Sequence, residues 1–306
     1  MEALQQIGLR HPRIRQVRHI ASNGAGGHHL LLAEGLWAHG VLVDLDATIE
    51  MFLWCPEAAY SAEAHALGAR VAARAKCAYR ISPRVLDLLC ERERPEGMVS
   101  LVALPAWDAD RIELQAEALV LVADAIEIPG NLGTLLRTLD ACGADCLIVT
   151  NRRTRLSHPM VFRGSRGMNL RVPVLEFADP AGVARWLRDR GFSVFLATVG
   201  ADAKPYQQAT FGQRTAVVVG NERKGITPSW LEHASDKITI PMHGRADSLN
   251  VAVSASILMY GIRERREAGQ RHAARPPTPR ACSGSWAWPL VAPRPMTPST
   301  LLASAV

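Results

Sequence analysis

Hydrophobic positions in the second half of the chain form short continuous runs separated by stretches of helical spacing. The runs are ALVLVAD (118–124), DCLIVT (145–150), FSVFLAT (192–198), AVVVG (216–220) and KITIP (237–241). Helical stretches open near Pro129, cover about 180–190 and end near Arg265. Short, wholly apolar strands that alternate with helices predict an α/β fold, with a parallel sheet covered on both faces.

The first hundred residues predict a smaller α/β unit. The run at 28–40 has helical amphipathic spacing, while 41–49 and 51–55 read as strands. A second helix is expected over 62–75. A third is expected after Ser82-Pro83, followed by a turn near Gly97 and a strand up to about 104. The predicted domains are 1–108 and 115–266, followed by a Pro/Ser/Ala-rich segment, 267–306, that we expect to be disordered.

The charge of the chain indicates a possible partner only where it is locally concentrated. The net charge is +6, but residues 261–306 hold seven Arg and two Glu, so +5 of it lies there. The overall charge therefore says little about a partner. Two local clusters say more: 151–171 holds six Arg and no acid, and a second basic cluster spans 10–19. No run reaches the roughly 18 apolar residues that span a bilayer, and no signal peptide precedes the first helix, so we expect a cytoplasmic protein.

The six cysteines show neither disulfide-framework nor zinc-site spacing. Cys142 and Cys146 lie four residues apart without a second Cys or His pair nearby, so reduced packing residues are the expectation. We therefore predict no metal site.

Three motifs hold most of the candidate chemistry. They are IPGNLGTLLRTLDACGA (128–144), AVVVGNERKGIT (216–227) and ITIPMHGRADSLNVAVSASILMYG (238–261). Each joins an apolar run to glycine, amide, hydroxyl or charged residues, where backbone can approach a ligand. Taken singly, each has a purely structural interpretation: an N-terminal helix turn, a turn acid and an N-cap serine.

In this order and spacing, the three motifs resemble the SpoU-type (TrmH-like) branch of the SPOUT RNA methyltransferases. The resemblance implies a C-terminal SPOUT α/β domain tied in a trefoil knot, with a small ribosomal-protein-like N-terminal domain that binds substrate. It also implies S-adenosylmethionine as cofactor, transfer to a ribose 2′-hydroxyl of RNA, and a homodimer. Ribosomal RNA is favoured over transfer RNA.

The resemblance also assigns roles to individual positions. The implied catalytic residues are Asn131, Arg137, Glu222, Ser248 and Asn250. The implied cofactor-binding residues are Thr198, Gly220, Ile240 and Leu249, and the implied RNA contact is Arg166. Glu222 would hold Arg137 or the substrate ribose, and Asn131 would orient Arg137.

The chemistry of arginine decides what Arg137 would do. A guanidinium is a poor base at neutral pH, since it stays protonated. We therefore expect Arg137 to bind a phosphate and to stabilise the negative charge that develops on the ribose oxygen.

Two other classes of protein remain as alternatives. One is an RNA-binding protein of the same fold that has lost catalysis; the joint presence of the five catalytic positions speaks against it. The other is a Rossmann-type dehydrogenase that uses the GNLG turn. Such an enzyme needs an acid about twenty residues beyond its glycines, where this chain has NRRTR (151–155).

Overall fold

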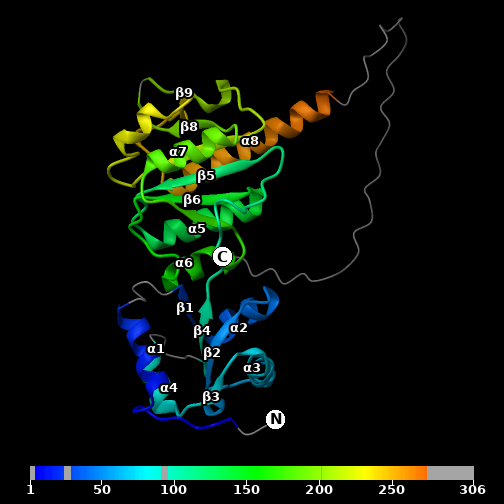
Figure 1. The fold of residues 1–306 in the computed structure, drawn as a ribbon, viewed down its shortest axis with the longest axis vertical. Helices are drawn as coiled ribbons and strands as arrows, with labels where there is room; N and C mark the ends of the chain where they lie inside the picture. The colour runs from blue at the N-terminus through cyan, green and yellow to red at the C-terminus, as the bar shows by residue number, and fades with distance from the viewer. Residues whose placement is uncertain (1–3, 24–28, 91–95, 201, 274–306) are drawn as a thin grey trace, which may run out of the picture. The chain divides into compact units, whose positions relative to one another are not determined.

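The computed structural model describes residues 4–23, 29–90, 96–200 and 202–273. The chain divides into two units, Met1–Arg266 and Glu267–Val306. The first unit holds two sheets, one between residues 30 and 103 and one between 119 and 239 (Figure 1). The predicted disordered segment lies largely outside the described residues, and the predicted boundary between 108 and 115 falls between the two sheets.

The first sheet has the strand order β1-β4-β2-β3 among the described residues. Its strands are β1 (Leu30–Glu34), β2 (Ile49–Trp54), β3 (Ala78–Arg80) and β4 (Met98–Ala103). β4 is antiparallel to β1 and β2, and β2 is parallel to β3. Its helices are α1 (Pro12–Asn23), α2 (Gly35–Asp44), α3 (Ala62–Arg74) and α4 (Pro83–Leu89), with a 3₁₀ turn, η1 (Pro56–Ala58). The predicted helices at 62–75 and after Ser82-Pro83 are confirmed.

The helix predicted at 28–40 is present only from residue 35 onward, and the prediction of a strand at 41–49 was wrong. Residues 30–34 form a strand, and residues 35–44 form one helix. The error has two causes. A short continuous apolar run does not distinguish a buried strand from a buried helix by periodicity. The change of conformation occurs at Gly35, whose φ of 83° is unfavourable for other residues.

The second sheet is wholly parallel, with the order β7-β6-β5-β10-β8-β11-β9. The strands are β5 (Leu119–Asp124), β6 (Cys146–Thr150), β7 (Val174–Glu176), β8 (Ser193–Ala197), β9 (Lys204–Pro205), β10 (Thr215–Val219) and β11 (Asp236–Thr239). The five predicted strands are confirmed, whereas β7 and β9 were not predicted. These two are three and two residues long, too short to show a period.

Helices cover both faces of this sheet, as predicted for a parallel sheet. On one face, α5 (Pro129–Cys142) and α8 (Val251–Ala273) pack against alternate residues of β5 and β10. On the other face, α7 (Pro180–Asp189) and η4 (Pro228–Glu232) pack against the intervening residues, with Trp230 fully buried (Figure 1). Three further short helices are α6 (Pro159–Ser165), η2 (Met168–Leu170) and η3 (Tyr206–Gln208).

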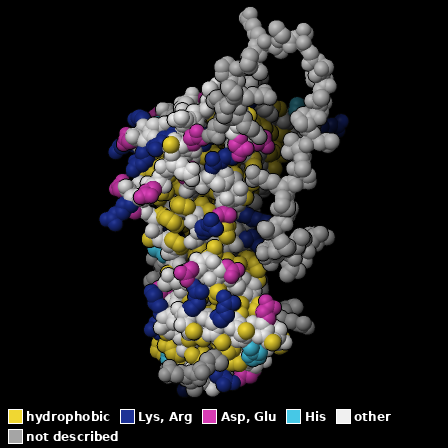
Figure 2. Space-filling view, turned by 90° about the vertical axis from the view of Figure 1, so that its right-hand side faces the viewer, with side chains coloured by type: hydrophobic (Ala, Val, Ile, Leu, Met, Phe, Trp, Pro, Cys, Tyr) yellow, Lys and Arg dark blue, Asp and Glu magenta, His cyan; other side chains and the backbone are white. Residues whose placement is uncertain are grey.

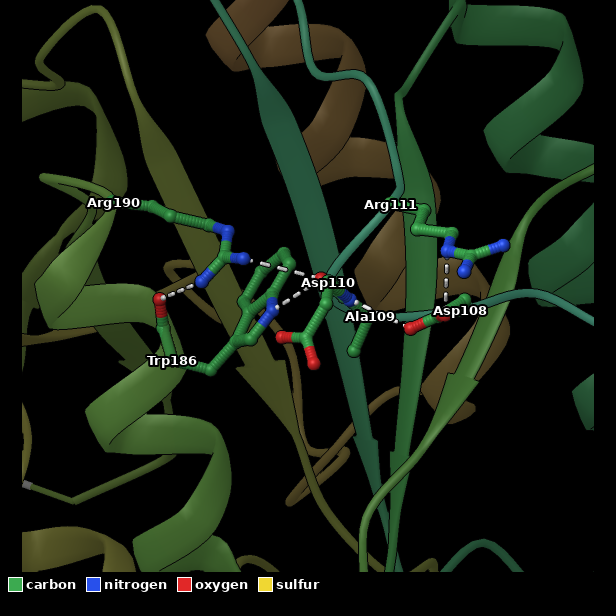
Figure 3. A network of polar contacts seen from close by, with 6 residues as sticks. All are labelled: Asp108, Ala109, Asp110, Arg111, Trp186 and Arg190. Atoms are coloured by element: carbon green, nitrogen blue, oxygen red, sulfur yellow. Dashed lines mark hydrogen bonds and ion pairs between the residues drawn. The ribbon is translucent and has the colours of Figure 1, made fainter.

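The segment that leads into β5 is fastened to α7 through one carbonyl. The oxygen of Ala109 accepts hydrogen bonds from the Trp186 indole nitrogen at 2.9 Å and from the Arg190 guanidinium at 3.2 Å (Figure 3). Arg190 also lies 4.4 Å above the Trp186 ring. Asp108 and Arg111 form an ion pair beside it. These contacts hold the connecting segment against the helix layer.

The last helix extends beyond its predicted end near Arg265, to Ala273. Near the predicted end, three arginines bind carbonyl oxygens of other segments. Arg263 binds Cys142 and Gly143 at the end of α5, and Arg265 binds Ala209 at 2.8 Å. Arg266 binds Glu117 at 2.7 Å and Gly212 at 3.0 Å. This part of the helix therefore contributes to the fold.

The described residues contain no helix that is both long and apolar enough to cross a bilayer. Nor do they contain a group of three or more His, Cys, Asp or Glu side chains able to hold a metal ion. The five described cysteines are all free.

A buried histidine in α2 makes the stability of this protein depend on pH. His39 is fully buried, with hydrogen-bond contacts to the Gly35 carbonyl at 2.8 Å and the Ser100 hydroxyl at 2.9 Å. Burial lowers the pKa of His39 to about 4, against the opposing effect of the Gly35 hydrogen bond. The unfolded chain therefore binds the proton between about pH 6.5 and 4, where the folded chain does not.

We expect the free energy of unfolding to fall by about 3 kcal/mol from this group as the pH drops from neutral to near 4. Urea denaturation at several pH values measures it. His39→Gln should show a shallower pH dependence, whereas substitution of the exposed His243 by Gln should follow the wild type. Equal pH dependence in wild type and His39→Gln would contradict the assignment.

Candidate active site

Several of the predicted site residues lie at one edge of the parallel sheet. Parallel strands end at a common edge, and ligands bind there where the strand order reverses. Here β5 continues to β6 on one side, while β8 and the later strands lie on the other. Thr198, Gly220 and Ile240 directly follow the carboxyl ends of β8, β10 and β11, and α5 begins five residues after β5.

Three of the predicted catalytic residues form a hydrogen-bonded chain. The Asn131 amide nitrogen donates to Glu222 Oε1 at 2.8 Å, and the Asn250 amide nitrogen donates to Asn131 Oδ1 at 3.1 Å. These residues are 91 and 119 positions apart in sequence and come from the start of α5, the loop after β10 and the start of α8. The structure thus joins one residue from each of the three motifs.

Glu222 also satisfies the open N-terminus of α5. Its carboxylate accepts from the backbone N–H of Glu127 at 3.3 Å and of Ile128 at 3.4 Å. Ile128, the N-cap residue, has no side-chain cap of its own, and a negative charge at a helix N-terminus is stabilising. The carboxylate therefore holds the start of α5 and Asn131, not Arg137 as the sequence suggested.

Arg137 and Ser248 lie outside this chain of hydrogen bonds. Arg137 is exposed, and no hydrogen bond or ion pair of its side chain is found among the described residues. Asn131 consequently does not orient Arg137 here. Ser248 donates to Asp247 at 3.3 Å and is not the N-cap of α8. Asn250 takes that place, because its Oδ1 accepts from Ala252 N at 2.9 Å.

Two further residues that the sequence reading passed over hold the loop after β10. Asn221, 7% exposed, donates to the Ala125 carbonyl at 2.9 Å. Asp124 is fully buried at the end of β5, where its carboxylate binds Thr150, Asn151 and the backbone N–H of Thr227. A carboxylate that ends an apolar strand was the available signal, since a buried acid needs partners of this kind.

Gly133 and Gly220 allow segments of the chain to pack closely against one another. A Cβ at Gly133 would lie 2.7 Å from the Val161 carbonyl and 2.9 Å from Ser165 N, so Gly133 lets α5 pack against α6. A Cβ at Gly220 would lie 2.2 Å from the backbone of both Gly225 and Ile226. The expectation that these glycines leave room for a ligand is therefore incomplete, because backbone of the same chain fills the space at both.

Three of the four predicted cofactor residues follow strand ends at this edge, and Leu249 precedes Asn250. The Thr198 hydroxyl oxygen is buried and has no hydrogen-bond partner among the described residues. A buried hydroxyl without a partner is unfavourable unless a ligand supplies one, so Thr198 fits the ribose hydroxyls or amino-acid group of S-adenosylmethionine. Ile240 is half-buried, and Leu249 is 37% exposed beside Asn250. They offer apolar surface of the kind an adenine ring contacts.

The predicted RNA contact, Arg166, occupies a special position. It is the C-cap of α6, with φ 57°, and its guanidinium carbon lies 4.6 Å from the centre of the Trp37 ring. Trp37 also contacts Phe162, with ring centres 5.5 Å apart. One face of Arg166 is therefore stacked on a residue of α2, although the side chain remains exposed.

Charged side chains of both signs are interspersed over the face shown in Figure 2, with no extended field of one sign. This agrees with the near-neutral charge of residues 1–260, where +6 minus +5 leaves +1. Attraction of a polyanion must therefore come from local groups of cations, not from the charge of the whole surface.

Comparison with known proteins identifies the class that this fold and site define. The sequence profile of the SpoU rRNA Methylase family matches residues 118–260. Over 185 residues the chain is 31% identical to the 23S rRNA (guanosine(2553)-2′-O)-methyltransferase RlmP of Bacillus subtilis (strain 168), covering 60% of this chain and 72% of that protein. The chain belongs to the SpoU rRNA methylase family.

Further relatives agree. A 23S rRNA (uridine(2479)-2′-O)-methyltransferase of Streptomyces viridochromogenes is 32% identical over 192 residues, covering 60% of this chain and 67% of that protein. The crystal structure of the SpoU methyltransferase AviRb of the same organism, in complex with AdoMet, superposes with a TM-score of 0.73 at 27% identity. It covers 85% of this chain and 99% of that one. The fold is therefore that of SpoU methyltransferases.

Proposed function

We propose that this protein transfers a methyl group from S-adenosylmethionine to a ribose 2′-hydroxyl of ribosomal RNA. The observation that carries the proposal is the hydrogen-bonded chain Glu222–Asn131–Asn250 at the carboxyl edge of the sheet. It brings together one residue from each motif in a family whose relatives are named as 23S rRNA 2′-O-methyltransferases.

The mechanism assigns a task to each group of residues. The cofactor supplies a methyl group carried on a sulfonium. Thr198, Gly220, Ile240 and Leu249 would hold it at the edge of the sheet. Glu222 and Asn131 fix the first turn of α5, and Arg137 lies further along the same helix. The ribose oxygen would bond to the methyl carbon as the carbon–sulfur bond breaks, and the hydroxyl proton would pass to water. A guanidinium there would stabilise the negative charge that develops on the oxygen. Alignment of hydroxyl and methyl group contributes the rest.

The product is a methylated ribose, not a methylated base formed by cysteine attack on a pyrimidine. Burial raises the pKa of Cys146 to about 12 and that of Cys55 to about 11, so neither thiol forms a nucleophilic thiolate at neutral pH. The polar groups at the site are amides, a carboxylate and a guanidinium, which suit hydroxyl and phosphate groups.

The test is to incubate protein-free 23S rRNA with the enzyme and labelled S-adenosylmethionine, and then to map the product. A 2′-O-methyl group blocks alkaline cleavage of the adjacent phosphodiester, so one step of the alkaline ladder should disappear. Label recovered on a free base would overturn the ribose assignment. Methylation of tRNA and not of rRNA would select the alternative substrate. Cofactor binding without turnover on either RNA would favour the alternative of an RNA-binding protein that has lost catalysis.

Three further features belong to the same proposal. The trefoil knot would form where the last strand, β11, and the last helix, α8, pass through an earlier loop of the chain. Residues 1–108 would bind RNA substrate, and Arg166 would contact RNA with the edge of its guanidinium that Trp37 leaves free. A cytoplasmic location would place the enzyme with its RNA, which cell fractionation tests.

We also propose a homodimer in which α8 contributes to the interface. Val253 and Tyr260 are 48% and 44% exposed and, at a spacing of seven residues, lie on one face of α8 with the partly buried Ile257. Exposed apolar residues at such spacing are typical of a partner surface.

Val253→Arg combined with Tyr260→Arg should therefore convert a dimer to a monomer in sedimentation equilibrium. Tyr60→Arg, a substitution at another exposed aromatic residue, serves as the control and should leave the mass unchanged. A wild type that sediments as a monomer would end this proposal.

A further inference from the structure

The loop that carries Glu222 is closed on itself. Asn221 and Gly225 exchange two backbone hydrogen bonds, each 2.9 Å long, and Gly225 adopts φ 70°. The Asn221 side chain accepts from the backbone N–H of Arg223 at 2.9 Å and of Lys224 at 3.0 Å. Residues 222–224 are thus held by the two bonds that close the loop between Asn221 and Gly225 and by two bonds to the Asn221 side chain.

Two buried residues also anchor the loop to the sheet. The Asn221 amide donates to the Ala125 carbonyl at the end of β5, and Asp124 accepts from Thr227 N at 2.7 Å. Asp124 and Asn221 are both buried, so these bonds are shielded from water. The sheet therefore fixes the position of residues 222–224.

The tip presents two cations. Arg223 and Lys224 are exposed, and neither side chain forms an ion pair or hydrogen bond with another residue in the part of the chain that the structure describes. The neighbouring Glu222 keeps its negative charge, but its carboxylate binds Asn131 and two backbone N–H groups and forms no ion pair with either cation among the described residues. Two positive charges thus stand beside the proposed catalytic chain on a loop whose backbone is held in place.

We propose that Arg223 and Lys224 form a phosphate clamp that binds the RNA backbone next to the nucleotide being methylated. This inference rests on the proposed function and adds the substrate contact. A guanidinium binds a phosphate through two parallel hydrogen bonds, and an ammonium binds it as a point charge. The phosphates that flank a target ribose are the negative groups that must lie near Glu222 and Asn131 when its hydroxyl is at the site.

Two features favour RNA over a solvated face or an acidic protein. A cation on a mobile loop loses conformational freedom on binding, whereas this loop is already ordered, which lowers the cost. The net charge of residues 1–260 is only +1, so the adjacent Arg223 and Lys224 supply positive charge beside Glu222 that the molecule as a whole does not. Contacts of this kind position nucleic acid without reading its sequence.

The experiment compares two double variants that each remove two positive charges. Arg223→Ala with Lys224→Ala removes the clamp, while Arg185→Ala with Arg188→Ala removes two exposed arginines of α7. Binding to a short fluorescent single-stranded RNA of mixed sequence is measured over a series of salt concentrations. Methylation of protein-free 23S rRNA is measured in parallel, with S-adenosylmethionine affinity as a check on the fold.

The clamp variant should bind RNA on the order of tenfold more weakly near physiological salt, with a salt slope smaller by about 1.4, because two fewer counterions are released. Its cofactor affinity should be unchanged. The α7 control should match the wild type, and the charge-conserving swap Arg223→Lys with Lys224→Arg should recover most of the affinity. Equal RNA binding and salt slope in wild type and clamp variant would overturn the clamp while leaving the methyltransferase intact. A wild type that methylates no RNA would overturn the proposed function instead, and the clamp with it.

Discussion

Arg137→Ala is expected to lower the methylation rate by 10²- to 10³-fold, the range for loss of one group that stabilises charge in the transition state. The same variant should bind S-adenosylmethionine as the wild type does and unfold at the same denaturant concentration. Arg137 is exposed, and its side chain has no recorded contact within the described residues, so its removal costs the fold little. Single-turnover assays and calorimetry on one preparation separate the two effects.

The comparison that sharpens this result is Arg137→Lys. A lysine keeps the positive charge but loses the planar, bidentate geometry of the guanidinium. If orientation matters, Arg137→Lys should retain only part of the activity. Near-wild-type turnover of Arg137→Ala would show that the charge at this position does not stabilise the reaction, and the proposed role would have to be abandoned.

Gly220→Ala is expected to damage both stability and activity. The added methyl carbon would lie 2.2 Å from Gly225 C and Ile226 N, which are backbone atoms that cannot move without displacing the loop. We expect a loss of about 2 kcal/mol or more in the free energy of unfolding, as for overpacking in a tight core. Methylation should fall further, since Glu222 and the phosphate clamp share that loop. Urea denaturation and the alkaline-ladder assay measure the two quantities.

Gly244→Ala provides the matched control, because a Cβ there meets no atom within 4 Å. It should keep wild-type stability. The family resemblance implies that Gly220 binds the cofactor, so a side chain at Gly220 could act on the cofactor directly. The structure attributes its main effect to the 220–226 loop, so weaker cofactor binding should accompany the loss of stability. A variant with normal stability and selectively weakened cofactor binding would contradict this.

Local pattern was sufficient for much of the fold, whereas the candidate site residues came from the resemblance of the three motifs to a known family. The five predicted apolar runs became β5, β6, β8, β10 and β11. β5, β6 and β10 are buried throughout, as expected for strands covered on both faces, whereas β11 is only partly buried. The motifs also supplied Asn131, Glu222 and Asn250 as a set. Where a continuous apolar run was ambiguous, at residues 28–44, the prediction was wrong, since periodicity cannot separate a short buried strand from a helix.

The sequence by itself determined five of the seven described strands of the parallel sheet and the helices α5, α7 and α8. Only the tertiary structure decided how the site residues pair. Glu222 binds Asn131 and the start of α5 instead of Arg137, Asn250 caps α8 in place of Ser248, and Arg166 stacks on Trp37. The physical reason is that such bonds join groups up to about 130 residues apart in sequence. Their partners depend on strand order, which hydrophobic periodicity does not contain.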